Sequence, residues 1–131
     1  MFERDYLMRL IADFMQGIRL SLERASGGHD PAGAADSLDR AIGSATDIDP
    51  DVLLALTSDS IASIMQVSGV DSRVVEYVAR SLLLSSRYHA EAGDADKAKL
   101  RLDQGLAVAR AYGYELTEAD AAPESMERLL D

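Results

Sequence analysis

Three arginines form the clearest pattern in this chain that could bind a ligand. Arg73, Arg80 and Arg87 are spaced by seven residues, so a helix would place them along one stripe. Guanidinium groups bind carboxylates and phosphates through paired hydrogen bonds. The stripe therefore predicts a groove for an acidic peptide or a C-terminal carboxylate. The alternative is a solvated stripe with local ion pairs to Glu76 and Glu91, which the spacing by itself favours.

The two histidines are the next candidates for acid–base or ligand chemistry. His89 falls on the apolar face of the helix predicted around it, with no partner close to it in the sequence. We favour a hydrogen-bonded core histidine, and the alternative is a small-ligand or enzyme site between helices near His89. His29 lies in a turn beside Asp30, whose role is explained by helix capping, so this pair predicts no metal site.

The acidic residues and the known catalytic motifs give no further site. Asp47, Asp49 and Asp51 alternate as in a calcium-binding loop, but Val52 and Ser58 stand where such a loop needs Gly and Glu. The chain has no cysteine, no nucleophile elbow, no phosphate-binding loop, no dinucleotide-binding fingerprint and no zinc-protease motif. We therefore expect no catalytic residue, no metal and no cofactor.

The composition is typical of a small globular protein. The chain has 131 residues, 47% of them hydrophobic, which predicts a single helical domain over residues 1–131. The net charge of −10 argues against nucleic acid and anionic membrane surfaces as partners. No apolar run reaches the roughly 18 residues of a membrane span, and charges occupy the N-terminus where a signal peptide is apolar. We therefore expect a cytoplasmic protein.

The elements that would position these residues are all helical. Apolar residues recur at helical spacing, and no segment alternates as a strand does. Asp-Pro pairs at 30–31 and 49–50 are typical helix starts. The predicted helices span about residues 2–25, 31–45, 50–67, 71–92 and 95–112, and a short C-terminal helix holds Met126, Leu129 and Leu130.

The apolar positions also predict which faces are buried. The helix over 71–92 is apolar almost all round, so we expect it at the centre of the fold. In the helix over 50–67 the residues Thr57–Ser60 are a weak point that could divide it in two. Its expected inward residues are Leu53, Leu56, Ile61, Ile64 and Val67. Those of the helix over 95–112 are Ala98, Leu102, Leu106 and Ala109, with a second apolar strip at Leu100 and Val108.

Two segments 64 residues apart share a pattern of small residues and leucine. One has Ala98, Leu102, Gly105 and Leu106, and the other has Ala34, Leu38, Ala41 and Ile42. This pattern resembles the second helix of a tetratricopeptide repeat, and Leu82 and Ser86 match positions of its first helix. The chain departs from that family in having no Trp and in placing its aromatic residue at Tyr88. The resemblance implies a stack of antiparallel hairpins whose first helices line a concave face, and a non-catalytic adaptor that binds a protein or peptide.

The N-terminal helix has a second interpretation. The segment Phe2 to Ile11, FERDYLMRLI, resembles the start of a small family of uncharacterised bacterial helical proteins, which lends no catalytic residue. Phe2, Tyr6 and Met8 lie outside the main apolar stripe of this helix and could cover a partner subunit. Packing within the chain is the simplest explanation, and a homodimer contact through Phe2 and Tyr6 is the alternative.

Overall fold

The fold is all-α, as the sequence predicts. The computed structural model describes the backbone of residues 2–131 and the side-chain surroundings of residues 4–131, and it contains no strand over that range. Its elements are α1 (Phe2–Ser26), α2 (Pro31–Thr46), α3 (Pro50–Leu53), α4 (Ser58–Val67), α5 (Ser72–Glu91), α6 (Ala95–Ala111), the 3₁₀ turn η1 (Glu118–Ala121) and α7 (Pro123–Leu130).

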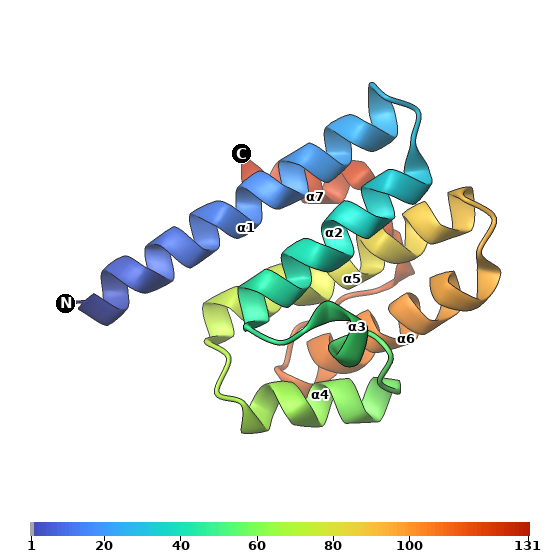
Figure 1. Ribbon diagram of the computed structural model, residues 1–131. Helices are drawn as coiled ribbons and strands as arrows, with labels where there is room; N and C mark the ends of the chain where they lie inside the picture. The colour runs from blue at the N-terminus through green and yellow to red at the C-terminus, as the bar shows by residue number, and fades with distance from the viewer. Residues whose placement is uncertain (1) are drawn as a thin grey trace.

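The helices pack as two antiparallel pairs with additions (Figure 1). Helix α1 packs on α2, α2 packs on α5, and α5 packs on α6. The short α3 contacts α2, α4 lies against α6, and the C-terminal η1 and α7 return to α5. Helix α5 therefore touches more elements than any other helix among the described residues.

Aspartates start four of these helices by accepting a hydrogen bond from a backbone N–H of the first turn. The accepted N–H belongs to Gly33 in α2, Asp51 in α3, Arg73 in α5 and Lys97 in α6, at 2.8–3.1 Å. Proline follows at the first helical position of α2 and α3, where its missing N–H costs nothing. The predicted helix starts are confirmed.

Helix α5 lies at the centre of the core, as its wide apolar arc predicts. Twelve of its residues are buried, among them serines and a histidine as well as apolar side chains. Glycines allow close helix packing on two sides of the core: a Cβ at Gly105 would lie 2.9 Å from Leu83 Cδ2, and one at Gly17 would lie 2.9 Å from Ala41 Cβ. The small residues of the sequence pattern therefore do lie at helix contacts.

The helix expected over residues 50–67 is two helices. The Thr57 hydroxyl accepts a hydrogen bond from Ser60 N at 3.3 Å and starts α4 as a new helix. Because the break reorients the second piece, the inward face predicted by extending the pattern from Leu53 is correct beyond the break at Ile61 but wrong at Ile64 and Val67. Ile64 is 40% exposed and Val67 is 84% exposed. Helix α4 buries Ile61 as predicted, and with it Ala62 and Met65.

The buried face of α6 also differs from the prediction. Ala98 and Ala109 are buried as expected, but Leu102 and Leu106 are only half-buried. The buried face instead includes Val108 and two long polar residues, Arg101 and Gln104. It is turned this way because α6 packs between α5 and α4, and these two polar side chains bind backbone carbonyls in the segment between α3 and α4.

Candidate functional site

A buried polar cluster joins three helices around the carboxylate of Asp39. The Ser85 hydroxyl donates to Asp39 Oδ1 at 2.6 Å, and His89 Nε2 lies 3.1 Å from Oδ2. Arg101 donates to the same carboxylate from Nε at 3.4 Å and from Nη2 at 3.3 Å. The side chain of Asp39 is 13% exposed, that of Arg101 7% and that of His89 6%. One carboxylate of α2 is thus held by donors from α5 and α6.

The cluster continues into the segment that links α3 and α4. Arg101 Nη1 donates to the Leu54 carbonyl at 2.9 Å, and Gln104 Nε2 donates to the carbonyls of Leu54 and Leu56 at 3.0 and 2.7 Å. These carbonyls follow the end of a four-residue helix, where no later turn satisfies them. A buried carbonyl without a hydrogen-bond partner destabilises the fold. By donating to these carbonyls, the two side chains allow the segment between α3 and α4 to be buried.

The positions of the donors follow from helix geometry. Ser85 and His89 are four residues apart on α5, and Arg101 and Gln104 are three apart on α6, so each pair lies on one face of its helix. Ser86 adds a contact between the same two helices by donating to the Ala98 carbonyl at 2.6 Å. The spacing within each helix, together with the packing of α5 on α6, therefore brings these polar side chains to the interface between the two helices.

The electrostatics of the cluster favour an ionised Asp39. Burial by itself raises the pKa of the Asp39 carboxyl, but the hydrogen bond from His89, the charge of Arg101 and the bond from Ser85 together lower its pKa below the ordinary value. An ionised carboxylate only accepts hydrogen bonds, so His89 Nε2 carries the hydrogen that points at it. The favoured interpretation of His89 as a hydrogen-bonded core residue is confirmed, with a partner that lies 50 residues away.

A pocket of about 420 Å³ opens beside this cluster, between α2, α3 and α6. In Figure 1 the short α3 lies below α2 and above α4. The buried pair Asp39 and Arg101 forms part of the pocket wall, together with the apolar residues Pro50, Leu54, Ala55 and Leu100. Its rim carries four exposed charged residues, Asp36, Arg40, Asp51 and Lys97. None of the four side chains forms an ion pair with another described residue.

The predicted arginine stripe lies on the opposite side of α5. Arg73 Nε lies 3.1 Å from an oxygen of Asp71, and Arg87 Nε lies 3.4 Å from an oxygen of Glu91. Arg80 Nε lies 3.1 Å from an oxygen of Glu76, and its Nη1 lies 3.7 Å from an oxygen of Asp120 in η1. Each guanidinium thus has a carboxylate of its own chain beside it, and the middle one is also covered by the C-terminal segment.

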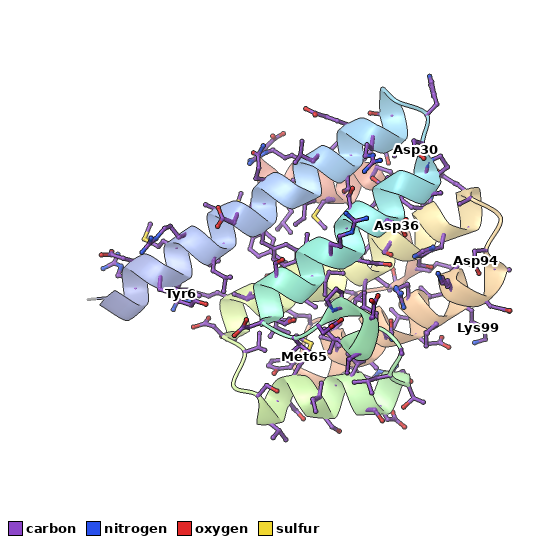
Figure 2. The ribbon with its side chains drawn as sticks, viewed as in Figure 1. Tyr6, Asp30, Asp36, Met65, Asp94 and Lys99 are labelled. Atoms are coloured by element: carbon purple, nitrogen blue, oxygen red, sulfur yellow. The ribbon has the colours of Figure 1, made fainter. Side chains whose placement is uncertain are left out.

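The two other groups of candidates lie apart from the cluster. Tyr6 is 59% exposed near the free end of α1 (Figure 2), and the side chain of Phe2 lies outside the described residues. His29 is exposed in the turn before α2. The side chain of Asp49 caps α3. No group of three metal-ligating side chains gathers anywhere in the part of the chain that the structure describes.

Sequence reasoning missed Asp39, Arg101 and Gln104. Each lies beside apolar residues on a helix, and the inward face predicted for α6, at Ala98, Leu102, Leu106 and Ala109, does not include Arg101 or Gln104. One signal was present: His89 and Ser85 sit on the apolar face of the central helix, where a buried polar group needs a partner. That requirement predicts a polar residue on a neighbouring helix, but it does not say which one.

No protein-family model, curated protein or solved structure matches this chain. Across residues 2–131 every helix is too short or too polar to cross a membrane.

Proposed function

We propose that this chain is a non-catalytic binding module that holds a segment of another protein in the pocket between α2, α3 and α6. The observation that carries the proposal is the pocket rim, where two acidic and two basic side chains are exposed and have no ion-pair partner among the described residues. Charges that are paired within a protein contribute little to binding a ligand, whereas these four lack an ion-pair partner in the described part of the chain and can contact one.

The buried cluster supports a structural role better than a catalytic one. Asp39 already accepts hydrogen bonds from three side chains, and Arg101 and Gln104 are engaged by backbone carbonyls. A general base must reach a substrate proton, and a carboxylate held by three donors is a weak base. The alternative of an enzyme or small-ligand site near His89 is therefore less well supported than binding at the rim.

The chemistry of the wall favours a peptide over a small molecule. Six of the ten residues that line the pocket are charged. Pockets for small ligands are mostly apolar and enclose most of the ligand, whereas protein interfaces have apolar centres with polar rims. Since the rim carries both signs of charge, the matching segment has at least one basic and one acidic side chain around an apolar residue.

The arginine stripe remains a second predicted surface, for an acidic peptide. Arg73 and Arg87 are accessible beside their carboxylates, while Arg80 is not free, because Glu76 and Asp120 contact it. An acidic ligand would have to compete with these carboxylates. The net charge of −10 also opposes an acidic ligand at long range.

We also propose that the fold is tetratricopeptide-like, and the arrangement of the helix pairs supports this proposal. Helices α1 and α2 form one antiparallel pair, α5 and α6 form another, and small residues mark the close contact in each. The inserted α3 and α4 depart from a simple stack. A cytoplasmic location and a protein partner are likewise proposals that the acidic composition and the pocket support.

Titration of the ¹⁵N-labelled protein with capped nine-residue alanine–leucine peptides tests the proposed pocket. One peptide carries two Lys and two Glu, one carries Glu alone, one carries Lys alone, and one is uncharged. We expect the mixed-charge peptide to shift amide signals of residues 51–55 and 97–101. A stronger effect of the Glu peptide on α5 around Arg73 and Arg87 would support the stripe instead.

Two matched variants locate the surface. Arg40→Ala/Lys97→Ala removes two rim cations and should weaken binding about fivefold, since an exposed charge contributes roughly 0.5 kcal/mol. Lys99→Ala/Arg110→Ala removes two cations of α6 that do not line the pocket, and it should leave binding unchanged. Equal weakening by both variants, or no shift with any peptide, would overturn the proposal.

A further inference from the structure

The N-terminal end of α1 extends beyond the rest of the molecule. Helix α1 has 25 residues and α2 has 16, which at 1.5 Å per residue are about 37 Å and about 24 Å. The two are antiparallel and joined by a short turn, so the excess length lies at the start of α1. Figure 1 shows this end projecting past α2 and α5, and Figure 2 shows Tyr6 on it.

A pocket of about 780 Å³ lies beneath this projecting end. Residues of α1, of the end of α2 with its cap, and of the loop and first turn of α5 form its walls: Arg4, Tyr6, Leu7, Leu10, Ala45, Thr46, Asp47, Ser68, Gly69, Val70, Asp71, Arg73 and Val74. Leu10 and Val70 are only half-buried there. The molecule therefore presents an exposed helical end and, beside it, a partly apolar hollow.

The charges around this hollow are partly satisfied. Arg73 is held by Asp71 at 3.1 Å. Arg4 and Asp47 are both exposed, and neither forms an ion pair with another described residue. The same patch therefore carries a cation on the helix and an anion on the opposite wall, each without an ion-pair partner among residues 4–131.

This combination is self-complementary. In a two-fold dimer the same patch of each subunit meets, so a group on one side must match a different group on the same surface. Arg4 of one copy can then face Asp47 of the other, and Asp47 of the first can face Arg4 of the second. In such a dimer each projecting end would lie in the hollow of the opposite subunit, so the contact would be made twice.

We infer that this face is a homodimer interface in which Tyr6 of each copy enters the hollow under α1 of the other. The occupant of the pocket is thus a second copy of the chain. The inference is independent of peptide binding, because the proposed peptide pocket shares no residue with this one.

Molar mass and sedimentation, measured from about 5 to about 500 µM, test the inference because a dimer grows with concentration. We expect a concentration-dependent dimer in the unmodified chain. Tyr6→Ser should raise the dissociation constant at least about tenfold, as loss of a central aromatic anchor does. Met8→Ser is the matched control: Met8 is 61% exposed on the same projecting end but does not line the pocket, so it should leave the constant unchanged.

Charge reversal tests the register of the dimer. Arg4→Glu should weaken the dimer, and Arg4→Glu/Asp47→Lys should restore it, because the reversed charges again face each other. Asp47 has a φ of 58°, a conformation that Lys adopts less readily, so thermal unfolding is measured alongside. A monomer at every concentration, or a dimer that Tyr6→Ser and Arg4→Glu leave intact, would overturn the inference.

Discussion

Helix α5 has polar residues on two faces, one buried against other helices and one exposed to solvent. Ser85 and His89 face Asp39 in the buried cluster, while Arg87, about 160° away from both on the helix at 100° per residue, belongs to the exposed stripe. The bonds of Asp39 span 46 to 62 residues, whereas Arg87 pairs with Glu91 four residues later. The buried bonds join separate helices, and the exposed pair stabilises only its own helix.

The buried charges therefore stabilise the packing of the helices against one another, whereas the exposed charges are solvated and contribute little to it. A buried ion that loses its partner stays desolvated and uncompensated, so removal of the partner is costly. An exposed ion that loses its partner regains water. The two faces should therefore respond to the same kind of substitution by very different amounts.

The largest expected effect is that of Asp39→Ala. The substitution leaves Arg101 and His89 buried without their carboxylate and should lower the free energy of unfolding by about 3–5 kcal/mol. Urea denaturation followed by circular dichroism measures the change. Asp36→Ala removes an exposed carboxylate that pairs with no other described residue from the same helix, and it should change stability by less than about 0.5 kcal/mol. Similar losses in both variants would show that the cluster does not hold the helices together.

The contribution of Asp39 to stability should also depend on pH. Because the pKa of Asp39 is lower in the folded chain than in the unfolded one, its stabilising contribution is complete above about pH 5 and is lost as pH falls through the folded pKa. Asp39→Asn lacks this contribution at every pH. The stability gap between the unmodified chain and Asp39→Asn should therefore shrink as pH falls from about 7 to about 3. A gap that stays constant would contradict an ionised, stabilised Asp39.

The outcome for α5 shows what local patterns can predict. The apolar arc of this helix, its start at Asp71 and its central position all follow from residues close together in the sequence. Short-range ion pairs such as Arg87 with Glu91 follow from the four-residue spacing. These features depend on helix geometry alone, so the sequence is sufficient for them.

The buried cluster needed information that one helix does not contain. Asp39, His89 and Arg101 come together only when the registers of α2, α5 and α6 are fixed relative to one another. Periodicity gives the direction of each side chain about its own axis but not the neighbour it meets. For the same reason Ile64 and Val67 were expected inward, since the pattern does not show how a break redirects α4.

The smallest expected effects on stability are those of substitutions in the arginine stripe, where Arg80 and Arg87 should differ from each other. The side chain of Arg80 is 21% exposed and contacts Glu76 and Asp120, whereas that of Arg87 is 49% exposed and contacts Glu91 alone. Arg80→Ala should therefore cost about 0.5–1 kcal/mol, and Arg87→Ala between about 0 and 0.5 kcal/mol.

Hydrogen exchange separates the two sites further. Arg80→Ala removes the ion pair between α5 and η1, so amides of residues 118–121 should exchange faster, while Arg87→Ala should leave them unchanged. Salt should reduce the cost of Arg87→Ala by a larger fraction than that of Arg80→Ala, because it screens exposed pairs most. If Arg87→Ala lowered the free energy of unfolding as much as Asp39→Ala does, the exposed stripe would stabilise the fold as strongly as the buried cluster, which would contradict this comparison.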